Sequence, residues 1–171
     1  MIAVLLCSTI LCAQSESVRE YQIKAAYIYN FTNFVTWPSE AFSSDRAPFI
    51  IGIFRDDPIY PYLKEIITGE SVDGHRLIIK QYEDFEDLKT CHILVINDLE
   101  TDKLSSSDIS ALKKGNTLTV SNMPNFTQKG GIVKFFNKNN KIHLQINNEA
   151  AKAADLVISS KLLNLADIFF P

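Results

Sequence analysis

The chain has 171 residues, of which 46% are hydrophobic and 22% are charged, with a formal net charge of −3. This length fits one domain with a substantial core, and the composition excludes an intrinsically disordered chain. The charge balance, and the absence of a basic stripe with interleaved aromatic residues, give no electrostatic reason to bind nucleic acid or anionic lipid.

The chain begins with an apolar run over residues 2–11. Its length is typical of a signal peptide and is too short to cross a bilayer comfortably. Small residues precede the polar Gln14, so we predict a signal peptide over residues 1–13, a mature domain over residues 14–171 and a periplasmic location. The alternatives are a lipoprotein acylated at Cys12 and a buried strand at the N-terminus.

Removal of residues 1–13 would leave Cys91 as the only cysteine of the mature chain. A single cysteine cannot form an intramolecular disulfide. Cys91 is then either a buried small hydrophobic residue, which we expect, or one half of a bridge between two chains.

Residues 18–35 carry apolar side chains at helical spacing with a narrow polar face, which predicts a helix buried on most sides. Trp37-Pro38 ends it, because a proline disfavours helical geometry for the residue before it. Strand-like and helical segments then alternate: a strand over 48–54, a helix within 56–68 that starts near residue 60, a strand over 77–82, a helical turn over 84–88, a strand over 92–97, a helix over 105–113 and a strand over 117–121.

This alternation predicts a single α/β domain with a mostly parallel sheet flanked by helices. The pattern then changes, and residues 131–136 and 141–147 predict an antiparallel C-terminal hairpin at the sheet edge. An alanine-rich helix over 148–154 follows. Ser159 or Ser160 caps a last short helix, whose predicted inward residues are Leu162, Leu163, Leu165 and Ala166.

The sequence offers little catalytic chemistry. His75, His92 and His143 have no metal-ligand spacing, and no serine lies in a nucleophile motif. No glycine cluster forms a phosphate-binding loop, and Gly130-Gly131 is typical of a tight turn. We therefore predict no catalytic residue, no metal site and no cofactor.

Aromatic residues are concentrated near the N-terminus, where six lie between positions 21 and 37: Tyr21, Tyr27, Tyr29, Phe31, Phe34 and Trp37. Core packing accounts for most of them. Tyr27 and Tyr29, however, point about 200° apart on a helix, so a core on one side of the helix cannot cover both rings, and another element or a partner has to cover the second. We therefore predict a partner-binding surface formed by Asn30 and Trp37, with Lys161 as a weaker third member. The alternative is that Trp37 only fills the core below the helix.

Several of these segments resemble the YfiR family. The resemblance is carried by residues 24–31 with Trp37-Pro38, and by Gly74-His75-Arg76, residues 91–94, 118–121, Gly130-Gly131 and 159–163, which follow in the family's order. It implies a periplasmic α/β protein, often dimeric, that restrains an inner-membrane diguanylate cyclase until an outer-membrane lipoprotein relieves the restraint. It also implies paired cysteines, from which this chain departs because only Cys91 remains after signal removal.

We therefore predict a non-enzymatic regulator that binds the periplasmic part of a membrane sensor, a diguanylate cyclase or alternatively a histidine kinase. Two other functions stay open. One is a periplasmic small-molecule-binding protein, and the other is an enzyme whose site is assembled from scattered polar residues.

Overall fold

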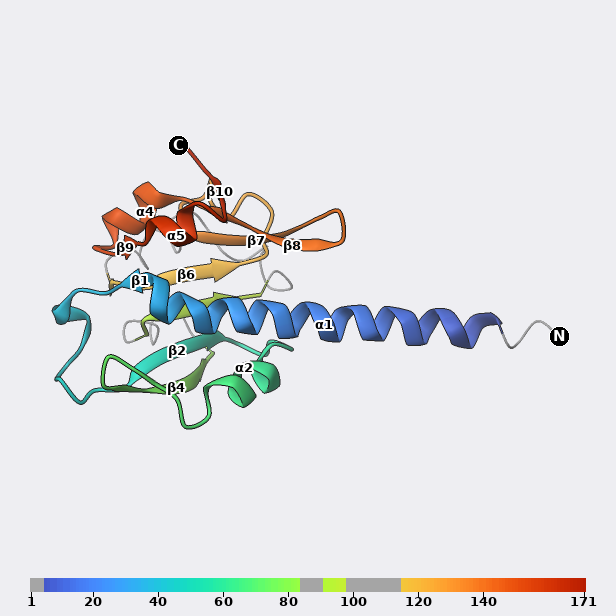
Figure 1. The fold of residues 1–171 in the computed structure, drawn as a ribbon, viewed down its shortest axis with the longest axis horizontal. Coiled ribbons are helices and arrows are strands. Elements are labelled where there is room, and N and C mark those ends of the chain that lie inside the picture. Colours follow the sequence, from blue (N-terminus) through green and yellow to red (C-terminus); the bar gives the residue numbers. More distant parts are fainter. Residues whose placement is uncertain (1–4, 84–90, 98–114) are drawn as a thin grey trace.

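The computed structural model describes the backbone of residues 5–83, 91–97 and 115–171, and the side chains in these ranges from Ser17 onwards. An eight-stranded sheet organises the fold, in the order β10-β8-β7-β6-β5-β2-β4-β3 (Figure 1). Its strands are β2 (Phe49–Phe54), β3 (Ser71–Val72), β4 (His75–Tyr82), β5 (Ile93–Ile96), β6 (Leu118–Ser121), β7 (Val133–Lys138), β8 (Lys141–Ile146) and β10 (Asp167–Ile168).

Most pairs in this sheet are parallel, as predicted. Strand β2 runs parallel to both β4 and β5, and β5, β6 and β7 continue in parallel. Within this sheet, the described strands that pair antiparallel are β3 with β4 and the hairpin of β7 with β8. The α/β fold class and the hairpin are therefore confirmed.

The two faces of the sheet carry separate apolar clusters, because successive side chains of a strand point to opposite faces. Phe49, Ile51 and Ile53 lie in the larger cluster with α1 (Leu5–Phe34), α2 (Tyr60–Ile67), α4 (Asn148–Ala153) and α5 (Ser160–Leu163). Ile50 and Phe54 lie in the smaller cluster with Leu94, Ile96 and Phe126. Burial of both faces explains why the strands have continuous apolar sequences rather than alternating ones.

Helix α1 is longer than the sequence pattern predicts, since it starts at Leu5 rather than near residue 18. No glycine or proline interrupts residues 5–34, so nothing in the backbone stops the helix there. Its first part projects from the rest of the protein (Figure 1). The alternative of an N-terminal strand is therefore wrong, whereas signal-peptide cleavage remains a prediction. Across the described residues, no helix is sufficiently long and apolar to span a bilayer.

The C-terminal region differs from the prediction in two respects. The hairpin does not form the edge of the sheet, because β10 lies outside β8 and runs parallel to it. Leu165 is 70% exposed rather than inward-facing, because α5 ends at Leu163 and the helical spacing stops there. The predicted cap of the last helix is present, because the Ser159 hydroxyl accepts a hydrogen bond from the Leu162 amide. The Asn147 side chain caps α4 in the same way by accepting from the Ala150 amide, which the sequence analysis did not predict. The segments predicted over 84–88 and 105–113 lie outside the described residues.

Cys91 is buried between β2 and the chain that leads into β5, as predicted. A Cβ atom placed on Gly52 would lie 3.1 Å from the Cys91 sulfur and 2.9 Å from the Tyr82 ring. Gly52 therefore allows the Cys91 and Tyr82 side chains to pack directly on the backbone of β2. Burial raises the pKa of the Cys91 thiol to about 12, so the thiol is protonated at neutral pH.

We expect Cys91 to react with a thiol reagent at pH 8 at least about a thousandfold more slowly in the native protein than in the unfolded chain, because the thiolate is the reactive form. A colorimetric thiol assay on a Cys7→Ser/Cys12→Ser variant isolates this residue. Rapid native labelling, or a dimer that dissociates on reduction, would show that Cys91 instead bridges two chains.

Candidate functional site

Trp37 lies at a corner where α1 ends and the chain crosses the amino ends of the central strands. After α1, the two-residue strand β1 (Val35–Thr36) pairs antiparallel with β9 (Val157–Ile158). Pro38 then leads into the 3-10 turn η1 (Ser39–Ala41). The following chain returns to the sheet at Phe49, where β2 begins. We call the surface around Trp37, Ser39 and Phe42 the Trp37 corner.

A stack of five rings underlies the Trp37 corner. The Phe42 ring lies between His75, at 3.9 Å between ring centroids, and His92, at 4.4 Å. His92 stacks in turn on Phe49 at 4.6 Å, and Trp37 meets Phe49 edge-on at 4.8 Å. The stack thus joins the loop that carries Phe42 to β2, β4 and the start of β5.

His92 is buried and neutral. Its Nδ1 accepts a hydrogen bond from the Ile50 amide at 3.0 Å, so Nε2 carries the proton and donates to the Ala41 carbonyl at 3.1 Å. Burial lowers the pKa of His92 to about 4; the Ala41 carbonyl opposes this shift, and the nearby His75 adds to it. At neutral pH the uncharged imidazole therefore links Ile50 to Ala41 through these two hydrogen bonds.

Two further hydrogen bonds fix the Trp37 corner. The Trp37 indole Nε1 donates to the His92 carbonyl at 3.2 Å. The His75 Nδ1 and the Ala47 carbonyl lie 2.6 Å apart, which places the imidazole proton on that nitrogen. Together with the His92–Ala41 bond, these contacts hold residues 37–47 against the sheet.

The Trp37 corner is hollowed on its outer side. The hollow has a volume of about 390 Å³ and combines aromatic walls with a polar rim. The walls are Trp37, Phe42, Phe49 and His75, and the rim includes Asn33, Thr36, Ser39 and Asp73. Aromatic residues are enriched in the centre of protein interfaces, and polar residues are typical of the interface rim.

The three predicted site residues gather near the end of α1, but only one lines the hollow. Trp37 is half-buried and forms part of its wall, whereas Asn30 is exposed one helical turn before the rim residue Asn33. Lys161 is exposed on α5, which the Ser159 amide ties to the Phe34 carbonyl at 2.8 Å. The predicted surface therefore surrounds the C-terminal end of α1, and its role stays a prediction.

Phe42, His75 and His92 belong to the Trp37 corner, and sequence reasoning did not place them in a site. They come from three separated segments, and nothing in their spacing indicates that their rings stack. Within residues 17–83, 91–97 and 115–171, no group of three or more His, Cys, Asp or Glu side chains is arranged to hold a metal ion.

The model of a protein family described as YfiR/HmsC-like matches residues 21–167, which is most of the chain. No curated protein matches the chain.

Proposed function

The chain belongs to the YfiR/HmsC-like family, and from this membership we propose that it is a non-enzymatic regulator in the periplasm. It binds the periplasmic part of a membrane signalling protein and restrains its activity. A diguanylate cyclase is the partner that the family membership favours, and a histidine kinase is the alternative. An outer-membrane lipoprotein is the candidate for relieving the restraint.

The observation that best supports a binding function is the hollow at the Trp37 corner. Trp37 leaves part of its ring accessible although it contacts Phe49 and donates a hydrogen bond to the His92 carbonyl. Trp is among the residues most enriched at binding hot spots, which lie in well-packed pockets ringed by less important contacts. We propose that a side chain of the partner enters this hollow, while Asn30 and Lys161 contribute to the surrounding rim.

Substitution of Trp37 itself would not separate binding from folding, because Trp37→Ala also removes the contact with Phe49. Ser39→Arg is the sharper change, since Ser39 is exposed and lines the hollow. We expect Ser39→Arg, and to a smaller extent Asn30→Arg, to fold normally and to weaken partner binding by about tenfold or more. Gln81→Arg is the matched control, because Gln81 is exposed six residues beyond His75 on β4.

The measurement is cyclic-di-GMP formation by membranes that contain a diguanylate cyclase of the same bacterium, with and without the purified protein. Addition of the wild type or of Gln81→Arg should lower the rate of cyclic-di-GMP formation. Addition of Ser39→Arg should leave that rate close to its value without added protein. A rate that stays unchanged at excess wild-type protein would refute the regulatory function for that cyclase. Equal inhibition by all variants would refute the Trp37 corner as the binding surface.

Export is tested separately. We expect mass spectrometry of the native protein from a periplasmic fraction to show an N-terminus near Gln14, because the apolar run over residues 2–11 has the length of a signal peptide. An intact Met1 in a cytosolic fraction would contradict the periplasmic location.

A further inference from the structure

A second hollow lies between α1 and the hairpin of β7 and β8, and the proposed regulatory function does not use it. Its volume is about 650 Å³. Arg19, Ile23 and Tyr27 line it from α1, and because they are spaced four residues apart they lie along one face of the helix. Lys141 and Ile142 of β8 line it from the hairpin. We call this space the hairpin hollow.

The floor of the hairpin hollow is apolar and partly accessible. Ile23 is 36% exposed, and Tyr27 and Ile142 are half-buried. The Tyr27 ring packs against Phe135 of β7, at 6.0 Å between ring centroids, and against Phe31 at 6.4 Å. These contacts hold the ring in place, so its free surface stays open to the hollow. Such a floor can receive an apolar side chain of another molecule.

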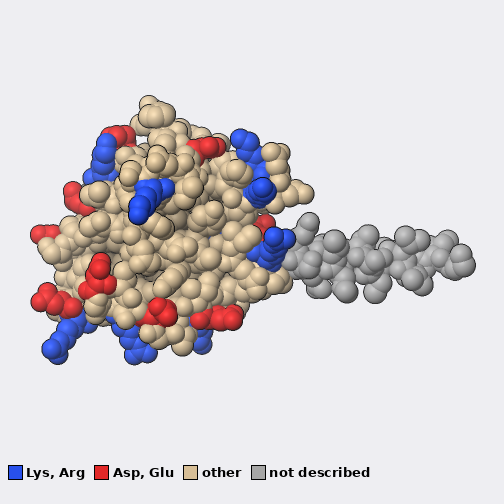
Figure 2. All heavy atoms as spheres, in the orientation of Figure 1, with Lys and Arg blue, Asp and Glu red and all other residues tan. Residues whose placement is uncertain are grey.

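The rim of the hairpin hollow is basic. Lys138 and Lys141 are exposed and lie directly opposite each other in the hairpin register, an arrangement of like charges that costs stability. Arg19 is exposed on α1. Figure 2 shows Lys and Arg side chains where α1 leaves the domain and near the end of the hairpin. None of the described carboxylates forms an ion pair with these three side chains.

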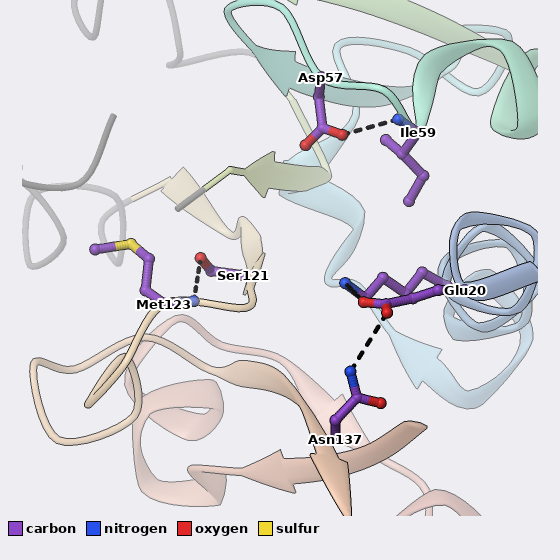
Figure 3. A network of polar contacts seen from close by, with 7 residues as sticks. Glu20, Asp57, Ile59, Ser121, Met123 and Asn137 are labelled. Atoms are coloured by element: carbon purple, nitrogen blue, oxygen red, sulfur yellow. Dashed lines mark hydrogen bonds and ion pairs between the residues drawn. The ribbon is translucent and has the colours of Figure 1, made fainter. Parts of the chain in front are cut away.

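Glu20 also lines the hairpin hollow, but its charge is already balanced. Its carboxylate forms an ion pair with the Lys24 ammonium and accepts a hydrogen bond from the Asn137 amide at 3.3 Å. Figure 3 shows this hydrogen bond between α1 and β7. The bond ties the hairpin to the helix, and the pairing with Lys24 leaves the positive charges of Arg19 and Lys141 uncompensated.

From this arrangement we propose that the hairpin hollow binds a polypeptide segment of a second protein, in which a large apolar side chain is flanked by Asp or Glu. The apolar side chain contacts Ile23, Tyr27 and Ile142, and the carboxylates pair with Arg19 and Lys141. The concave shape favours a polypeptide over an anionic bilayer, because a flat bilayer surface would meet the rim without reaching the floor.

This surface is distinct from the Trp37 corner. The residues that line the hairpin hollow are not among those that line the hollow at the Trp37 corner. A segment bound in the hairpin hollow therefore leaves the Trp37 corner free for its own partner.

The experiment is a chemical-shift titration of the full-length protein with three acetylated and amidated hexapeptides. The first has two central leucines flanked on each side by two glutamates. The second replaces the glutamates with lysines, and the third replaces the leucines with serines. The first peptide should bind about tenfold or more tightly than either of the others, because the second exchanges ion pairs for repulsion and the third loses apolar burial.

Two variants test the rim and the floor separately. Lys141→Glu should weaken binding of the glutamate–leucine peptide by about fivefold or more without lowering the thermal unfolding midpoint, because the new carboxylate faces Lys138 across the hairpin. Lys80→Glu is its control, with the same charge change at an exposed position on β4. Ile23→Gln should also weaken binding by about fivefold.

Val18→Gln is the control for Ile23→Gln and should bind normally, because Val18 is similarly exposed on α1 but points about 140° away from Ile23. Absence of a saturable shift with the glutamate–leucine peptide, equal affinity for the lysine peptide, or full binding by Lys141→Glu would each overturn the proposal. So would sedimentation with phosphatidylglycerol vesicles that depends on Lys141 when the peptide does not bind. The titration contains no membrane signalling protein, so its outcome is independent of the proposed regulatory function.

Discussion

Gly131→Ala is expected to lower the thermal unfolding midpoint by about 6–12 °C, which corresponds to a loss of about 3 kcal/mol for a domain of this size. A Cβ atom at position 131 would lie 2.2 Å from the Phe126 ring, and Phe126 is fully buried. The Gly131 amide also donates to the Phe126 carbonyl at 2.9 Å, so the backbone cannot move away without losing that bond. The measurement is a thermal melt followed by circular dichroism.

Two further variants test the cause of this effect. Gly115→Ala should change the midpoint little, because the nearest atom to its added Cβ is the Thr117 hydroxyl oxygen at 3.4 Å. Phe126→Leu, introduced together with Gly131→Ala, should recover part of the loss because the smaller side chain leaves room for the methyl group. An unchanged midpoint for Gly131→Ala alone would contradict the close packing.

Acidification is expected to remove up to about 3 kcal/mol of the free energy of unfolding through His92 alone. The pKa of His92 is lowered from 6.5 to about 4 in the folded protein, so the unfolded chain binds a proton that the native protein does not. The contribution of His92 to the free energy of unfolding therefore has its full value above pH 6.5 and is lost progressively as the pH falls towards 4. Protonation of Nδ1 would also break the bond from the Ile50 amide.

Urea unfolding between pH 4 and 7.5 measures this contribution. His92→Asn should be less stable at pH 7 but should lack the His92 part of the pH dependence, because asparagine does not titrate. His143→Asn is the control, since His143 lies on β8 away from the ring stack. If His92→Asn loses as much stability on acidification as the wild type, His92 is not the group that links acid to unfolding.

Protonation of His92 should also affect the proposed binding surface at the Trp37 corner. His92 holds the Ala41 carbonyl and stacks on Phe42, so its protonation should loosen the segment that forms the wall of the Trp37 hollow. Binding of a partner at the Trp37 corner should therefore weaken as the pH falls below about 5.

The sequence by itself determined the elements whose signal is local. The continuous apolar runs of β2 and β5 predicted buried strands, because both faces of a parallel sheet are covered. Pro58 and Pro61 predicted that α2 starts near Tyr60, as it does. Polar residues 137–140 predicted the hairpin turn, in which Asn139 and Asn140 adopt positive φ angles. The cap at Ser159 was predictable for the same reason, since a cap joins residues three positions apart.

Only the tertiary structure decided how these elements meet. The pairing of β1 with β9 joins strands of two residues each, which are too short to carry a periodic pattern. The stack brings the Phe42 ring against His75 and His92, each of which lies more than thirty positions from Phe42 in the sequence. The order of the strands in the sheet determines these contacts. Hydrophobic periodicity does not depend on that order, because a strand has the same pattern at every position in the sheet. One sequence pattern is therefore compatible with many arrangements of the polar side chains.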